Sequence, residues 1–242
     1  MHIVYINPNA TGSMTDDIVR VARAAAPQAR VTGLTNHAGP PAIQGADDGE
    51  AAVPGVLECV AEARRRGADA IVIACFDDTG LEEAQAAADC PVLGIGQSAY
   101  TLAKLTGGRF TVVTSLPVSV PVIEDNIARA GFGPFCAAVR ASGLAVLEIE
   151  QGAEATRAAL SEAIRAAQTE TACRTVILGC AGMAPLHADL GARTGAALID
   201  GVAASAQLAL AAIGQRPENG RDPVEDAKRV VEEYLRLSMI PD

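Results

Sequence analysis

Two cysteines stand at equivalent points of an internal repeat. Cys75 ends the apolar run AIVIAC, and Cys180 ends the run TVILGC. The cysteines lie 105 residues apart, and Gly96 and Gly201 each follow their cysteine after 21 residues. A chain of two similar halves can place one thiol on either side of a shared cleft. Such a pair can remove a proton from one face of a carbon and return one to the other face.

A thiol must ionise before it acts as a base, and free cysteine titrates near ~8.5. Cys75 and Cys180 both precede predicted helices, whose N-termini lower the pKa of a thiol. We therefore expect one thiolate and one thiol at rest, titrating as a coupled pair, with roles that exchange with the enantiomer bound. Loop amides after each cysteine are candidates to hold a developing oxyanion. The alternative, a buried core cysteine, is our interpretation of the other four, which are Cys59, Cys90, Cys136 and Cys173.

Short β-branched runs alternate with alanine-rich stretches along the chain. This pattern is typical of a parallel α/β sheet and predicts the strands and helices that position the two thiols. Strands are expected at residues 2–6, 30–34, 70–74, 91–95, 109–114, 138–141, 175–179 and 196–199. Helices are expected at residues 14–26, 50–66, 80–88, 97–105, 118–130, 154–168, 185–193 and 201–213. The repeat predicts two lobes, one of residues 1–98 with 208–242 and one of residues 99–207. Within the first lobe, residues 216–222 are expected to be a linker and residues 224–237 an amphipathic helix.

Helix ends are predicted from capping residues. A capping box at Thr79 is expected to open the third helix, and Ser13 with Asp16 to open the first. Gly67 and Gly131 are expected to end helices, because glycine readily adopts the left-handed backbone.

Ligands of open parallel sheets bind beyond the carboxyl ends of the strands. The loops at residues 7–9, 75–80, 114–115 and 180–183 all follow such ends, so we expect them to line one crevice between the lobes. Asn9 is a candidate to donate its amide to a substrate carbonyl, although a turn-capping role is also open. Asp77 is a candidate to offer its backbone N–H to the substrate while its side chain caps the helix. A catalytic role for the side chain is less favoured, because a carboxylate beside Cys75 would raise the thiol pKa. Ile43 is a candidate apolar wall or an ordinary loop residue.

Five short motifs resemble the hydantoin and allantoin racemase family, which belongs to the wider Asp/Glu racemase superfamily. They are INPN at residues 6–9, ACFDDTGL at 74–81, VTS at 113–115, VPVI at 120–123 and GCAGM at 179–183. The resemblance covers roughly residues 1–213. It implies an α/β fold of two pseudo-symmetric Rossmann-like lobes, each with a parallel sheet flanked by helices, and an active site in the cleft between them. It also implies an isomerase without cofactor or metal, Cys75 and Cys180 as proton carriers, and a homo-oligomer.

The candidate substrate is a small cyclic amide. The loop at residues 77–79 resembles the hydantoin branch more than the allantoin branch, where we expect Gly-Asp-Pro. The predicted reaction is racemisation of 5-monosubstituted hydantoins, with allantoin as the alternative and aspartate or glutamate less favoured. The candidate substrate-binding residues are Asn9, Ile43, Phe76, Asp77, Thr114, Ser115, Ala181 and Gly182.

Composition argues against several other classes. The net charge of −10 disfavours nucleic acid and anionic membranes as partners, and no stretch has the length of a signal peptide or membrane span, so we expect a cytoplasmic protein that acts on small molecules. The segment GIGQSA at residues 94–99 matches a dinucleotide fingerprint only weakly, and tight packing of strand on helix also explains its glycines. A disulfide exchange reaction would need Cys75 and Cys180 to bridge the cleft. A binding module without catalysis also stays open.

Overall fold

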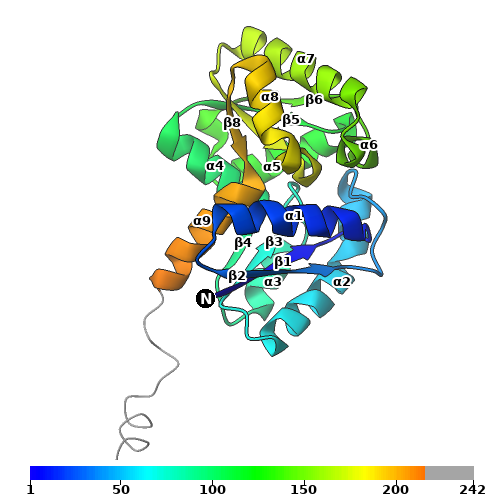
Figure 1. The fold of residues 1–242 in the computed structure, drawn as a ribbon, viewed down its shortest axis with the longest axis vertical. Helices are drawn as coiled ribbons and strands as arrows, with labels where there is room; N and C mark the ends of the chain where they lie inside the picture. The colour runs from blue at the N-terminus through cyan, green and yellow to red at the C-terminus, as the bar shows by residue number, and fades with distance from the viewer. Residues whose placement is uncertain (216–242) are drawn as a thin grey trace, which may run out of the picture.

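The computed structural model describes residues 1–215, and Figure 1 shows two lobes in this part of the chain. The linker predicted at residues 216–222 and the helix predicted at 224–237 lie outside the described residues. Within residues 1–215, no helix is both long and apolar enough to cross a membrane.

The first lobe is a parallel sheet in the order β2-β1-β3-β4. Its strands are β1 (His2–Asn7), β2 (Arg30–Thr35), β3 (Ala70–Ile73) and β4 (Val92–Gly94), and its helices are α1 (Gly12–Ala25), α2 (Ala46–Arg65) and α3 (Leu81–Ala87). Side chains alternate across a strand, so β1 serves both faces. Ile3 and Tyr5 pack on the side of α1, and Val4 and Ile6 pack on the side of α2 and α3.

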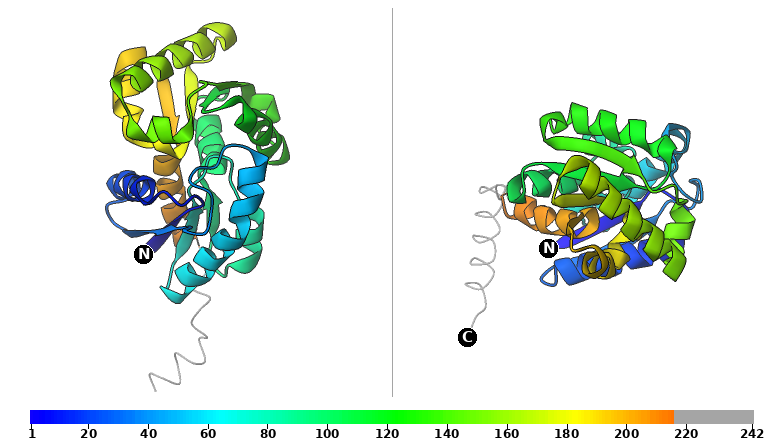
Figure 2. Two further views of the ribbon diagram at one scale, coloured as in Figure 1. Left: turned by 90° about the vertical axis from the view of Figure 1, so that its right-hand side faces the viewer. Right: turned by 90° about the horizontal axis from the view of Figure 1, so that it is seen from above.

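The second lobe repeats this arrangement with a parallel sheet in the order β6-β5-β7-β8. Its strands are β5 (Phe110–Thr114), β6 (Cys136–Ala141), β7 (Thr175–Gly179) and β8 (Ala197–Asp200). Its helices are α5 (Val120–Arg129), α6 (Val146–Gln151), α7 (Glu154–Thr171) and α8 (His187–Thr194), with 3-10 turns η1 (Pro117–Ser119), η2 (Gly133–Phe135) and η3 (Ala181–Leu186). The same strand order in both sheets confirms the predicted fold of two similar α/β lobes, seen from two further sides in Figure 2.

Two helices connect the lobes. α4 (Ile95–Thr106) follows the last strand of the first sheet but packs on β7 and β8, and α9 (Gly201–Gly214) follows the last strand of the second sheet but packs on α1 and β3. On α4, Tyr100 stacks on Phe110 at 5.9 Å between ring centroids and meets Phe76 edge-on at 5.6 Å. One apolar core therefore runs through both lobes. The predicted boundaries at residues 98 and 207 fall inside these two helices, and the assignment of residues to lobes stays a prediction.

Several local predictions differ from the structure. The short helix α6 was not predicted, because six residues with no capping signal show too little periodicity. The Thr79 cap is wrong, because α3 follows Gly80 and the Thr79 side chain does not cap it. The Ser13 and Asp16 caps are also wrong, because α1 begins at Gly12 and has no side-chain cap. Gly67 and Gly131 do follow helix ends, with φ of 68° and 78°, as predicted.

Candidate active site

A small cavity lies between the lobes, beyond the carboxyl ends of the central strands. Its volume is about 20 Å³, which is room for roughly one water molecule. The lining residues are Asn9, Met14, Ile43, Ala74, Cys75, Phe76, Asp77, Ser115, Ser119, Val146, Gly179, Cys180 and Ala181. Any larger ligand therefore requires the walls to move apart.

Strand register explains why these loops meet. In the second sheet Thr114 pairs with Gly179, so the next residues along, Ser115 and Cys180, leave the sheet side by side. In the first sheet the Ala74 N–H donates to the Ile6 carbonyl at 2.8 Å, so residues 7–9 lie beside Cys75 in the same way. Each lobe thus contributes one thiol and one polar loop to the cavity.

Cys75 and Cys180 are free thiols that line this one cavity. The backbone N–H groups of Gly182 and Met183 act to lower the pKa of the Cys180 thiol, and the Thr79 side chain and the N–H of Asp77 act to lower that of the Cys75 thiol. Backbone donors of this kind favour a negative charge on sulfur. That the loop amides after each cysteine hold the oxyanion of a substrate stays a prediction.

The charge state of the thiols differs from the prediction. Burial raises the pKa of the Cys180 thiol to about 11, and burial together with the Asp77 carboxylate raises the pKa of the Cys75 thiol well above its usual value. The expected lowering by helix N-termini is wrong, because desolvation of a buried thiolate outweighs the backbone donors. Cys180 does precede η3, but a turn separates Cys75 from α3. Both groups are thiols at neutral pH, and Cys180 ionises more easily.

Asn9 is fixed by its own loop. Its side-chain oxygen accepts from Asn7 Nδ2 and from the Thr11 N–H, both at 2.9 Å. Its amide nitrogen contacts only the sulfur of Met14, at 3.2 Å, which is a weak acceptor. The side chain is buried, so a polar ligand in the cavity would find a rigid amide donor. A turn-capping role for the oxygen and a donor role for the nitrogen are therefore compatible.

The two neighbouring aspartates have different surroundings. Asp78 accepts from the N–H groups of Gly96 and Gln97 at 2.9 and 2.8 Å, and so caps α4 from a distant loop. Asp77 does not cap a helix, which corrects the prediction for its side chain, since Oδ2 is buried without a hydrogen-bond partner. Burial raises the pKa of the Asp77 carboxyl to about 7, and a hydrogen bond from Ser119 opposes the rise.

The other candidate residues divide into two groups. Ile43, Phe76, Ser115 and Ala181 line the cavity. Thr114 does not line it, which departs from the prediction: its hydroxyl donates to the Gly179 carbonyl at 2.8 Å, because alternation along β5 turns it away from the loop that carries Ser115. Gly182 also lies outside the lining and reaches the site only through its N–H.

Met14, Ser119 and Val146 also line the cavity and were not among the residues predicted from the sequence. A signal was present, because Met14 and Ser119 are separated by the same 105 residues as the two cysteines. Ile43 and Val146 form a similar pair, 103 residues apart. The repeat therefore extends to the walls of the cavity.

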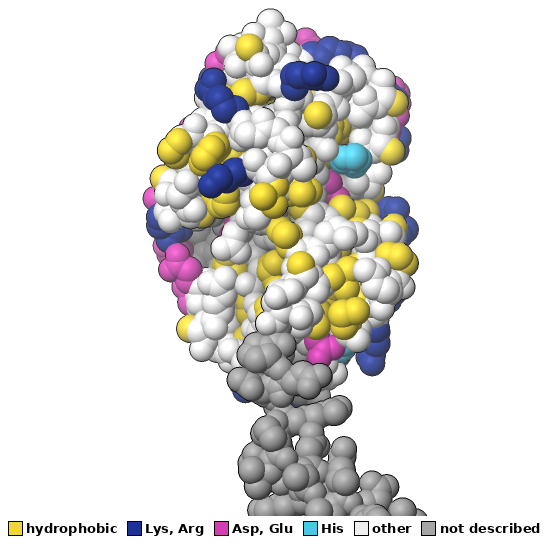
Figure 3. Space-filling model, turned by 90° about the vertical axis from the view of Figure 1, so that its left-hand side faces the viewer, with side chains coloured by type: hydrophobic (Ala, Val, Ile, Leu, Met, Phe, Trp, Pro, Cys, Tyr) yellow, Lys and Arg dark blue, Asp and Glu magenta, His cyan; other side chains and the backbone are white. Residues whose placement is uncertain are grey.

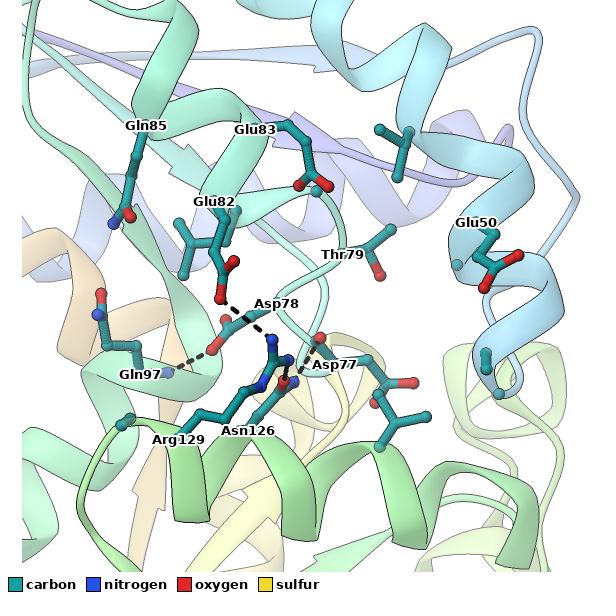
Figure 4. A pocket seen from close by; sticks show the side chains of 18 residues that line it. Glu50, Asp77, Asp78, Thr79, Glu82, Glu83, Gln85, Gln97, Asn126 and Arg129 are labelled. Atoms are coloured by element: carbon teal, nitrogen blue, oxygen red, sulfur yellow. Dashed lines mark hydrogen bonds and ion pairs between the residues drawn. The ribbon is translucent and has the colours of Figure 1, made fainter.

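Two larger pockets lie outside the cysteine cavity. One of about 430 Å³ is bounded by the loop at residues 77–80, by α2 and α3, and by α5, and shares Asp77 with the cavity (Figure 4). The other, of about 510 Å³, is an apolar groove between α1, α4, α8 and α9, on a face where hydrophobic side chains gather between the lobes (Figure 3). Within residues 1–215, no three His, Cys, Asp or Glu side chains gather as metal ligands would.

The weak dinucleotide motif has a structural explanation. The Asp78 carboxylate occupies the N–H groups at the start of α4 that a phosphate would need, and a Cβ on Gly94 would lie 2.0 Å from the Asp78 carboxylate. A Cβ on Gly96 would lie 2.5 Å from the Phe76 carbonyl oxygen. Close packing, rather than a nucleotide, therefore explains these glycines.

Comparison with known proteins agrees with this geometry. The Asp/Glu/Hydantoin racemase family matches residues 3–209, and a hydantoin racemase of Rhizobium meliloti is 40% identical over 215 residues, covering 88% of this chain and 89% of that protein. The solved allantoin racemase of Klebsiella pneumoniae is 34% identical with a TM-score of 0.85, covering 88% of each chain. A glutamate racemase of Francisella tularensis, 16% identical with a TM-score of 0.65, covers 86% of this chain and 79% of its own and shares the fold. The chain belongs to the Asp/Glu/Hydantoin racemase family and is an isomerase of the racemase class.

Proposed function

We propose that the protein racemises 5-monosubstituted hydantoins by proton transfer between Cys75 and Cys180. The observation that carries the proposal is that both thiols line one cavity between the lobes. A thiolate removes the proton from C5, the electrons move into the C4 carbonyl, and the opposite thiol protonates the other face. The reaction needs neither an oxidant nor a cofactor, because one C–H bond is broken and one is made, and no oxidation state changes.

The two thiols share one ionisation. Burial raises the pKa of both, and the N–H groups of Gly182 and Met183 act in favour of the Cys180 thiolate. One enantiomer requires the thiolate of Cys180 and the other that of Cys75, so the two thiols act as one coupled pair.

A neutral ring suits the lining better than a free amino acid. Apart from the thiols, Asp77 is the only ionisable side chain among the lining residues, and no Lys, Arg or His lines the cavity. The α-carboxylate of an amino acid would lose hydration there without a fixed partner of opposite charge. Hydantoin is therefore favoured over aspartate and glutamate. Allantoin, a 5-substituted hydantoin, is the second candidate, supported by the similarity to a solved allantoin racemase.

Exchange of C5–H for deuterium tests the function. Enantiopure 5-methylhydantoin, 5-benzylhydantoin, allantoin, aspartate and glutamate are each incubated with the protein in D₂O, and deuterium incorporation and optical rotation are followed. We expect exchange with inversion for the hydantoins. Exchange into an amino acid alone, or into allantoin alone, would contradict the substrate assignment.

Single cysteine variants test the two-base mechanism. Cys75→Ser and Cys180→Ser should each lose racemisation by at least about 1000-fold, because serine is a poor base in the same place. Each variant should still exchange deuterium into the one enantiomer whose C5–H faces the remaining thiol, and the two variants should prefer opposite enantiomers. Cys59→Ser is the matched control and should retain activity. Full racemisation by either active-site variant would refute the assignment.

We also propose a cytoplasmic homo-oligomer, following the expectation from the family resemblance. Light scattering of the full chain measures the subunit number directly. A monomer at micromolar concentration would contradict this part of the proposal.

A further inference from the structure

The cavity lining has one feature that breaks the symmetry of the repeat. Six pairs of lining residues come from matching places in the two lobes, 103 to 106 residues apart, and they are Asn9 with Ser115, Met14 with Ser119, Ile43 with Val146, Ala74 with Gly179, Cys75 with Cys180 and Phe76 with Ala181. Asp77 is left without a counterpart, because Gly182 stands 105 residues further on. A carboxyl group is thus present on one side of a cavity whose halves are otherwise matched.

The Asp77 carboxyl has spare hydrogen-bonding capacity. Its Oδ2 is buried and has no partner, whereas both oxygens of the neighbouring Asp78 are used to cap α4. A buried polar atom without a partner is costly unless a ligand completes it. The unpaired oxygen belongs to a residue that lines the cavity of the two thiols.

The loop that carries Asp77 is held from the other lobe. Asn126 on α5 donates from Nδ2 to the Asp77 carbonyl at 2.7 Å, and Arg129 donates to Asn126 Oδ1 at 2.7 Å (Figure 4). Arg129 also forms an ion pair with Glu82 on α3 at 3.1 Å. These contacts span the cleft and fix the backbone of Asp77, so its side chain has a defined position relative to the cavity.

Asp77 also lines the neighbouring pocket, together with the charged residues Arg129, Glu50, Glu82 and Glu83. Cys75, Cys180, Asp78 and Tyr100 each experience the charge of Asp77. Ionising Asp77 therefore places a negative charge beside these groups and opposes the ionisation of each of them. Burial raises the pKa of Asp77 to about 7, so the carboxyl is neutral below that pH.

We propose that the neutral carboxyl of Asp77 binds the amide edge of the hydantoin ring, donating its O–H to the C4 carbonyl oxygen and accepting a hydrogen bond from N3–H. This inference rests on the proposed function. The C4 oxygen gains negative charge when C5 loses its proton, and the O–H bond of Asp77 stays intact while it stabilises that charge. An ionised Asp77 would instead repel both the thiolate and the developing enolate.

Variants of Asp77 test the role of the neutral form. Asp77→Asn replaces the carboxyl with an amide of nearly the same shape, which has a donor and an acceptor but cannot ionise. At about pH 6, kcat/KM of this variant should therefore stay within about threefold of the parent. As the pH rises through about 7, the ratio of this variant to the parent should increase. Asp77→Ala should lower kcat/KM by about 100-fold, the usual effect of losing a donor to an oxyanion. Glu83→Gln, in the neighbouring pocket, is the control and should match the parent.

A modified substrate identifies the contact itself. The parent should turn over 3-methyl-5-benzylhydantoin at least about tenfold more slowly than 5-benzylhydantoin, because the methyl group removes N3–H. Asp77→Ala should lose this discrimination, which a merely structural role would not change. A large loss in Asp77→Asn at every pH, or unchanged discrimination in Asp77→Ala, would overturn the inference. Absence of C5–H exchange in the parent would instead refute the proposed function, so the two failures are distinguishable.

Discussion

Cys180 and Cys75 share a cavity but not an environment. The N–H groups of Gly182 and Met183 favour the Cys180 thiolate, and the Thr79 side chain and Asp77 N–H favour the Cys75 thiolate, while the Asp77 carboxylate opposes both. Burial raises the pKa of both thiols, so only a small fraction is ionised at neutral pH. The thiolate that does form is a strong base towards a weakly acidic C–H, because its pKa is high.

A pH dependence follows at this scale. The thiolate fraction of a group with a pKa of about 11 rises about tenfold for each unit of pH increase up to that value, so log kcat/KM should rise between about pH 8.5 and 10 in Asp77→Asn, whose side chain cannot ionise. In the parent, loss of the neutral Asp77 carboxyl opposes this rise, so the slope is measured in the variant. Initial rates with enantiopure 5-benzylhydantoin measure the slope. A flat profile would show that neither thiol has the raised pKa described above.

Helix α6 closes one side of the cavity. Its first residue, Val146, lines the site, and the Val146 N–H donates to Gln44 Oε1 of the first lobe at 3.1 Å, between residues 102 positions apart. Gln44 lies next to Ile43, another wall of the cavity. This hydrogen bond joins the two lobes beside the cavity, whose walls must move apart to admit a ring.

Removing the hydrogen bond between Gln44 and Val146 should weaken the contact between the two lobes beside the cavity. Gln44→Ala loses one hydrogen bond, commonly worth about 1 kcal/mol, so we expect kcat/KM to fall about fivefold and the amides at the start of α6 to exchange hydrogen faster. Leu147→Ala, on the next residue of the same helix and partly exposed, is the matched control. Equal hydrogen exchange in Gln44→Ala and the parent would show that the contact does not restrain the helix.

The whole molecule is joined by α4 and α9, which each start in one lobe and pack on the other. Their N-termini touch, because a Cβ on Gly201 would lie 2.4 Å from the Ile95 carbonyl oxygen. Glycine at this point lets the two helices approach and brings both strand ends to one crevice. Gly201 thus permits the contact between the two helices, whereas the matched Gly96 leaves room for the loop that carries Phe76 and Asp78.

A methyl group at this contact should separate the helices. Gly201→Ala should destabilise the protein by about 2 kcal/mol, as overpacking of a core does, and should reduce racemisation because the thiols move apart. Gly214→Ala, at the far end of α9 with no atom within 4 Å of a new Cβ, should be neutral. Urea unfolding followed by circular dichroism measures both variants. Equal stability of the two would contradict the proposed role of Gly201.

The amino-acid sequence by itself determined the two α/β halves, the strands that end at Cys75 and Cys180, and the loops around Asn9, Phe76, Ser115 and Ala181. These are local or repeated patterns, so periodicity and spacing reveal them. Only the tertiary structure decided that Thr114 turns away, that α6 supplies Val146, and that Asp78 caps a distant helix while Oδ2 of Asp77 stays without a partner. It also reversed the expected pKa shift, because desolvation depends on everything packed around a thiol and not on its neighbours in the chain.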